Sequence, residues 1–135
     1  MTLLVYDAGA LIAADRNRSD FWLMHDRAIE RGVEPVVPAT VLTQVRRGPT
    51  QHGLAKLMRV CRVAALDRQT AELAGDLLGI AARSDIADAH VVVCCLTFAA
   101  TCVTSDDGDI RHLAAAARGD RAGRFGRRKL AIVHI

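Results

Sequence analysis

Leu3-Leu4-Val5-Tyr6-Asp7 sets the fold, because a short run without charge ends in an aspartate. Such a run is expected of a strand that is buried on both faces of a parallel sheet. Residues 8–14 follow at once with a helical pattern, so Asp7 lies where a strand ends and a helix begins. The stretch therefore predicts the first strand–helix unit of an α/β fold.

The same alternation continues to the end of the chain. Further strands are expected at residues 34–37, 62–66, 101–104 and 130–135. Helices are expected at residues 20–31, 40–47, 53–59, 68–82, 85–99 and 109–117. Strands separated by helices predict right-handed crossovers and a parallel sheet. We therefore expect one α/β domain over residues 1–135, with a mainly parallel five-stranded sheet flanked by helices.

Several residues mark where these helices begin and end. Gly32 is expected to stop the helix before it, and Thr40 and Asp67 are expected to cap the helices after them. Ser84 or Asp85 opens the helix at 85–99, which is apolar nearly all round. A helix with this pattern is expected in the centre of the fold, buried by its neighbours.

Composition narrows the class of protein. The 135 residues are 51% hydrophobic and 24% charged, which is typical of a globular domain. No apolar stretch reaches the roughly 18 residues of a membrane span, and no signal peptide is recognisable, so we expect a cytoplasmic protein without membrane contact. The four cysteines lie in apolar runs without metal-ligand spacing and are expected to be reduced core residues. A net charge of +3 permits a polyanionic partner without requiring one.

Four aspartates carry the functional signal: Asp7, Asp88, Asp106 and Asp109. Each follows a predicted strand or begins a predicted helix, and parallel strands bring their carboxyl ends to one edge of the sheet. Like charges about 4 Å apart repel by roughly 4 kcal/mol at an effective dielectric of 20. Acids that converge without matching bases therefore favour a divalent cation, and carboxylate oxygens suit Mg²⁺ or Mn²⁺.

Each acid also has an ordinary structural interpretation. Asp7 and Asp85 suit helix N-caps, and Asp88, three residues after Asp85, would complete something like a capping box. Asp106 and Asp109 lie in a turn, where Asp109 could cap the next helix. The structural interpretation is weakest for Asp88, because a carboxylate that begins such an apolar helix needs a partner.

The ordered set of segments resembles the PIN-domain ribonucleases, and specifically the short VapC-type toxins of toxin–antitoxin pairs. The matching segments are Val5-Tyr6-Asp7-Ala8-Gly9-Ala10-Leu11-Ile12, Asp85-Ile86-Ala87-Asp88-Ala89-His90-Val91-Val92 and Thr104-Ser105-Asp106-Asp107-Gly108-Asp109-Ile110. The resemblance covers nearly the full length. It implies a three-layer α/β/α fold, Mg²⁺- or Mn²⁺-dependent cleavage of RNA, a cognate antitoxin and a homodimer.

The resemblance also implies roles for individual residues. Asp7, Asp88 and Asp106 would be catalytic acids and metal ligands, and Asp109 a weaker ligand. Asp85 would be a neighbour of Asp88, and Thr104 and Ser105 would donate hydrogen bonds to the ligands. The family usually has a glutamate where this chain has Gln44. A neutral amide binds metal weakly, so this departure puts a second ion in doubt.

Two basic segments are candidates for RNA contact. One is Arg46-Arg47, just after Gln44. The other is the loop at 118–129, which has five arginines and one lysine against one aspartate. Within it, Arg124, Arg127 and Arg128 could bind phosphates and Phe125 could stack on a base. The alternative is an ordinary solvated loop, and the sequence does not say on which edge of the sheet it lies.

Two other functions remain open from the sequence. In the first, Gln44 marks decay of the site, and the domain binds antitoxin or RNA without cleaving. In the second, the chain is a receiver-like phosphoryl-transfer protein with Asp7 as nucleophile. A receiver should carry a lysine near the end of its last strand, whereas Lys129 precedes that strand.

Overall fold

A five-stranded parallel sheet forms the centre of the computed structural model, which describes residues 3–135. In chain order the strands are β1 (Leu4–Tyr6), β2 (Pro35–Pro38), β3 (Arg62–Ala64), β4 (Thr101–Thr104) and β5 (Ile132–His134). Their order across the sheet is β3-β2-β1-β4-β5, and every pair is parallel. The predicted parallel sheet is confirmed, with shorter third and fifth strands than the sequence suggested.

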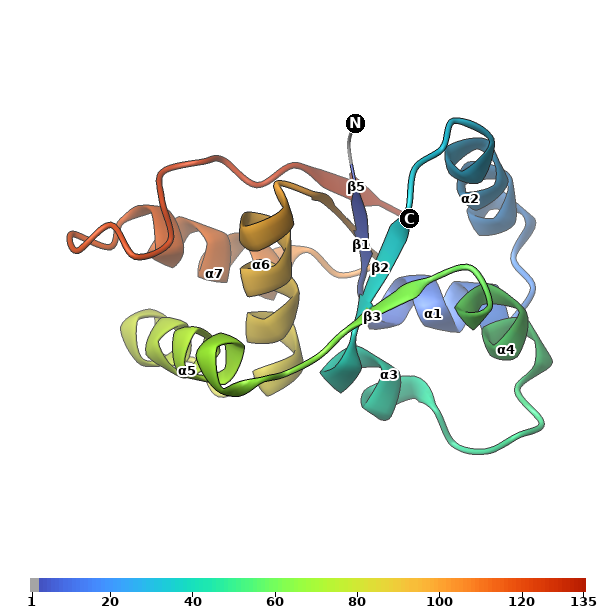
Figure 1. Ribbon diagram of the computed structural model, residues 1–135, viewed down its shortest axis with the longest axis horizontal. Coiled ribbons are helices and arrows are strands. Elements are labelled where there is room, and N and C mark those ends of the chain that lie inside the picture. Colours follow the sequence, from blue (N-terminus) through green and yellow to red (C-terminus); the bar gives the residue numbers. More distant parts are fainter. Residues whose placement is uncertain (1–2) are drawn as a thin grey trace.

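Helices cover the sheet on both sides (Figure 1). One side carries α1 (Ala8–Asp15), α2 (Ser19–Glu30) and α4 (His52–Met58), and the other carries α5 (Arg68–Ala81), α6 (Ile86–Phe98) and α7 (Gly108–Arg118). The short α3 (Ala39–Val45) follows β2 and contacts both α1 and α6. The fold is therefore the expected three-layer α/β/α arrangement.

The central helix is α6, as its sequence predicted. It packs on β1, β2 and β4, and its residues from Ala89 to Cys95 are all buried. Cys94, Cys95 and Cys102 are buried free thiols in the same core, and Cys61 is half-buried. The core that surrounds the middle of α6 places its first turn at the edge of the sheet.

The expected helix ends are mostly confirmed. Gly32 has a φ of 76° just after α2, which suits a glycine that ends a helix. The Asp67 carboxylate accepts from Thr70 N at 2.9 Å at the start of α5. Two cap predictions were wrong. Thr40 lies inside α3, where Oγ1 pairs with Nδ1 of His90 at 2.8 Å, and the residue before α7 is Asp107 instead of Asp109.

None of the helices within residues 3–135 is long and apolar enough to cross a membrane.

Candidate metal centre

The strand ends bring the first two candidate segments together. β1 and β4 are neighbours with Tyr6 level with Val103, so Asp7 lies beside Thr104. The backbone N of Asp7 donates to Val103 O at 3.0 Å. In Figure 1 the first turn of α6 points toward the same edge of the sheet, where α3 contacts both α6 and α1. Residues more than 80 positions apart in sequence therefore meet at one edge.

Asp7 is fixed by two hydrogen bonds. Its side chain is 6% exposed. Oδ1 accepts from the backbone N of Ala8 at 2.7 Å, so Asp7 is the N-cap of α1. Oδ2 accepts from the buried hydroxyl of Thr104 at 2.8 Å. The capping interpretation and the ligand interpretation are thus compatible, because each oxygen keeps a further lone pair for another partner.

Thr104 links Asp7 to the turn after β4. Its hydroxyl oxygen also accepts from the backbone N of Asp106 at 3.1 Å. One buried hydroxyl therefore binds both Asp7 and the backbone of Asp106, and fixes their relative positions. Thr104 thus makes the hydrogen bond to Asp7 that was expected of it. Ser105 is exposed, and its side chain makes no hydrogen bond within residues 3–135.

Asp85 and Asp88 form the start of α6. Asp85 Oδ1 accepts from the backbone N of Asp88 at 2.9 Å, which makes Asp85 the N-cap. This bond uses the backbone of Asp88 and leaves its half-buried carboxylate without a hydrogen-bond donor in the described chain. The box-like reciprocal bond from Asp88 is therefore not formed.

The charges of these acids act on one another. The pKa of Asp88 is raised to about 7, first by burial and then by the carboxylates of Asp85, Asp7, Asp109 and Asp106. The pKa of Asp7 is raised by burial, against its bonds to Ala8 and Thr104, and further by Asp85 and Asp106. Within residues 3–135, neither Asp7 nor Asp88 has a basic side chain within 4.0 Å. Among residues 3–135, Asp7 and Asp88 therefore form a concentration of negative charge that no adjacent basic side chain offsets.

Asp109 and Gln44 lie at the margin of this site. Asp109 is exposed and 3.8 Å from Nε of Arg83, so part of its charge is offset. Gln44, an exposed residue of α3, lines a shallow cavity with Asp85, Ser84 and Thr40. It also lines a second one with Ala8, Asp15 and Arg47. The structure thus brings Gln44 close to Asp85 and to the start of α1.

Gly9, in the first turn of α1, was not among the residues predicted to shape the site. A Cβ atom at this position would be 2.7 Å from Cβ and 2.9 Å from the backbone N of Ser105. Only glycine lets the first turn of α1 approach the turn after β4 this closely. The signal was available in sequence, since the glycine comes two residues after Asp7.

The two basic segments are on different edges. Arg46 and Arg47 follow α3 at the edge of the acids, and Arg47 lines the same cavity as Gln44. The loop at 118–129 connects the end of α7 to the start of β5, which is the opposite edge of a parallel sheet. In that loop Arg124 is bonded to Asp120 and to Asp76 of α5, and Phe125 packs against the core. Arg127 and Arg128 remain exposed but distant from the acids.

The carboxylates of Asp7 and Asp88 suit a hard divalent cation chemically, although they do not form a complete set of metal ligands. Among residues 3–135, no three His, Cys, Asp or Glu side chains are grouped tightly enough to hold a metal ion. Asp7 and Asp88 nevertheless supply only oxygen donors. Their pKa values are raised first by burial and then by neighbouring carboxylates, whose charge a cation would offset. Mg²⁺ keeps several waters when bound, so one or two carboxylates are enough for its ordinary protein sites.

Comparison with known proteins supports the fold. No protein-family model matches the sequence, and no curated protein matches it either. The structure is similar to a chain in the crystal structure of VapBC2 from Rickettsia felis bound to a DNA fragment from their promoter. The TM-score is 0.65, the match covers 99% of both chains, and 10% of the residues are identical. The likeness extends over the whole α/β/α arrangement, and the predicted PIN-like fold class is confirmed.

Proposed function

We propose that the chain is a Mg²⁺- or Mn²⁺-dependent endoribonuclease, the VapC-type toxin of a toxin–antitoxin pair. The observation that carries the proposal is the pair Asp7 and Asp88. The pKa of each carboxylate is raised first by burial and then by other carboxylates, and neither has a basic side chain within 4.0 Å among residues 3–135. The full-length similarity to a chain of the VapBC2 structure supports the same proposal at the level of the fold.

Each acid of the site would have its own role in metal binding and cleavage. Asp7 and Asp88 would hold the ion, directly or through water, and Asp106 would be a further ligand or orient the attacking water. Thr104 keeps the Asp7 carboxylate in one orientation through its 2.8 Å bond. A bound Mg²⁺ or Mn²⁺ ion would activate water and offset charge on the phosphodiester. Arg46 and Arg47, on the same edge, would contact the RNA backbone.

The proposal includes partners. A cognate antitoxin would cover the acidic edge, and the toxin would be a homodimer. The RNA would approach the same edge as the antitoxin, so the two would compete. This competition is what would keep the toxin inactive in its complex.

A second candidate is a domain that binds antitoxin or RNA without cleaving. Gln44 favours this non-cleaving domain. Its amide lines the same cavity as Asp85, at a position where PIN-domain ribonucleases usually have a glutamate. The absence of a closed three-acid cluster in residues 3–135 also favours it. The two candidates differ in one observable, which is cleavage.

The test is RNA cleavage by the whole chain with Mg²⁺ or Mn²⁺, with and without EDTA. Asp7→Asn should lower the rate by orders of magnitude, because the amide keeps the size but loses the ligand charge. Glu30→Gln, an exposed change at the end of α2, serves as the matched control and should cleave at the wild-type rate. Equal cleavage by folded Asp7→Asn and wild type would contradict the assignment, and no cleavage by wild type would favour the binding domain.

A further inference from the structure

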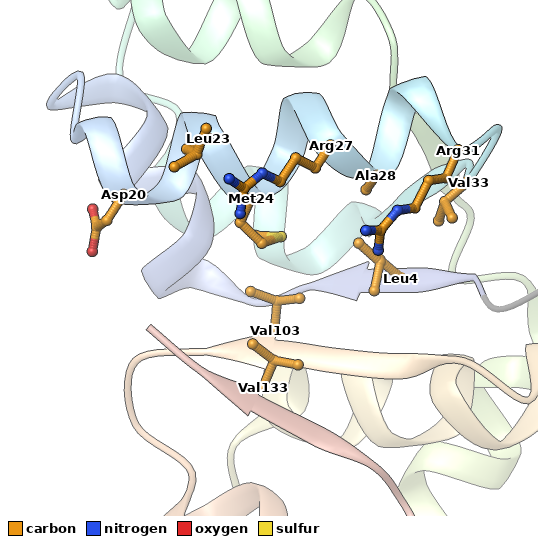
Figure 2. A pocket seen from close by; sticks show the side chains of 10 residues that line it. All are labelled: Leu4, Asp20, Leu23, Met24, Arg27, Ala28, Arg31, Val33, Val103 and Val133. Atoms are coloured by element: carbon orange, nitrogen blue, oxygen red, sulfur yellow. The ribbon is translucent and has the colours of Figure 1, made fainter.

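A groove of about 400 Å³ lies on the face of the sheet that carries α2. Its floor is formed by Leu4, Val103 and Val133, one from each of the neighbouring strands β1, β4 and β5 (Figure 2). Its wall is formed by residues 20, 23, 24, 27 and 28 of α2 and by Arg31, the C-cap residue of that helix. The groove lies on a face of the sheet, away from the acids at its edge, and the proposed function does not use it.

The groove exists because α2 is anchored by its other stripe. Phe21 and His25 are buried, and His25 Nδ1 is 2.7 Å from the hydroxyl of Tyr6. Trp22 Nε1 donates to Ala14 O at 3.2 Å, which fixes α2 to α1. Held in this way against β1, α2 does not cover the side chain of Val133 on β5. Leu23 is 54% exposed and Val133 is 40% exposed as a result.

The rim of the groove carries uncompensated positive charge. Arg27 lies in the last turn of α2 and Arg31 is its C-cap residue, and Figure 2 shows both side chains along the wall above the apolar floor. Neither has a carboxylate within 4.0 Å among residues 3–135. Asp20, at the other end, is already paired with Arg18. The groove thus has an apolar floor and a basic end.

We propose that this groove docks a segment of a partner protein that carries apolar side chains and at least one carboxylate. The apolar side chains would cover Leu23, Met24 and Val133, and the carboxylate would pair with Arg27 and Arg31. Arginine binds carboxylates in a bidentate manner, which fixes the direction of the segment. The wall from Asp20 to Arg31 extends over about 16 Å at about 1.5 Å per residue, the length of a three-turn helix.

A second copy of this chain fits the groove less well. A symmetric dimer places the same patch of both copies against each other. Here it would bring Arg27 and Arg31 of one protomer toward those of its partner, and like charges in an interface are unfavourable. An acidic partner segment offsets the same charges.

The experiment is selection of displayed random peptides of about twelve residues on the whole chain, followed by affinity measurement on the enriched peptides by fluorescence anisotropy. Enriched peptides should combine Asp or Glu with apolar residues. The double change Arg27→Glu and Arg31→Glu should weaken their binding by at least about tenfold. The matched control, Arg121→Glu with Arg128→Glu, reverses two exposed charges in the loop after α7 and should change affinity by less than about twofold.

Circular dichroism melts of both double variants establish that they are folded. No enrichment, or enriched peptides that lack carboxylates or bind the Arg27→Glu, Arg31→Glu variant as tightly as wild type, would overturn the proposal. A dimer in light scattering that disappears only in that variant would assign the groove to a second copy and overturn it as well. RNA cleavage is measured in a separate assay. If the chain does not cleave RNA, the peptide-binding result still tests the groove proposal.

Discussion

At the scale of single residues, the site depends on how each carboxylate is held. Asp7 is the more constrained, since both of its oxygens accept hydrogen bonds and one donor is the buried Thr104 hydroxyl. Asp88 is less constrained and has the more strongly raised pKa. The metal proposal depends on these two features: a carboxylate at Asp7 that is held by two hydrogen bonds, and a carboxylate at Asp88 whose pKa is raised by burial and by neighbouring acids.

The Thr104 hydroxyl can be removed with little change of shape. Thr104→Val leaves Asp7 Oδ2 without its donor, so the free energy of unfolding should fall by about 1–3 kcal/mol. The pKa of Asp7 should rise further, since that bond lowers it. Thr104→Ser keeps the hydroxyl and should recover most of the loss in urea titrations. Equal stability of the Val and Ser variants would mean that the bond contributes nothing.

The raised pKa of Asp88 should make the stability of the folded chain depend on pH. Its pKa is about 7 in the folded chain and near 3.8 when unperturbed, so the folded state binds more protons between these values. Stability of the metal-free protein should therefore fall as pH rises from about 4 to about 7, and the penalty should be complete above about 7. Asp88→Asn should flatten this slope. Denaturant titrations at several pH values measure it, and an unchanged slope in the variant would contradict the assignment.

At the scale of elements, strand–helix units were readable from sequence because each carries its own local pattern. The apolar run of α6 predicted a buried central helix, and the short uncharged run before Asp7 predicted a buried strand. Thr40 was misassigned because its hydroxyl pairs with His90, which is 50 residues away. A cap and a tertiary hydrogen bond use the same side-chain atom, and sequence alone does not separate them.

Two aspartate caps provide a comparison within one chain. Asp67→Ala removes an ordinary cap from α5 and should cost about 1 kcal/mol. Asp85→Ala removes the cap of α6 but also a charge that raises the pKa values of Asp7 and Asp88. Its net cost should be smaller without metal. Thermal melts of the two variants in EDTA decide this, and a larger loss for Asp85→Ala would mean that the repulsion is minor.

Gly9 connects the first helix to the turn after β4. Gly9→Ala would push α1 away from Ser105, whose backbone N is 2.9 Å from the added Cβ position. The change should destabilise the fold by about 1–3 kcal/mol, as overpacking does. Gly75→Ala on α5 is the matched control and should be neutral or slightly stabilising, because the added Cβ would meet no described atom within 4 Å beyond the nearby backbone of its own helix. Similar stabilities of the two variants in melts would remove the role given to Gly9.

At the scale of the whole molecule, topology decides which charged segments can act together. The order of elements predicted that Asp7, Asp88 and Asp106 lie at one edge, because parallel strands end there. The edge occupied by the loop at 118–129 was left open by sequence, and the parallel pairing of β4 with β5 places it opposite the acids. The Arg124–Asp76 pair that ties this loop to α5 joins residues 48 apart and has no local signal.

The most direct test of the account is stabilisation by metal. Only the folded chain assembles the acids, so Mn²⁺ should raise stability by about 2.7 kcal/mol at a hundredfold excess over its dissociation constant. At about 3 °C per kcal/mol, the melting temperature should rise by about 8 °C. Asp88→Asn should lose most of this rise, whereas Glu30→Gln should keep it. An equal rise in wild type and Asp88→Asn would mean that the ion binds elsewhere, and would contradict the metal centre.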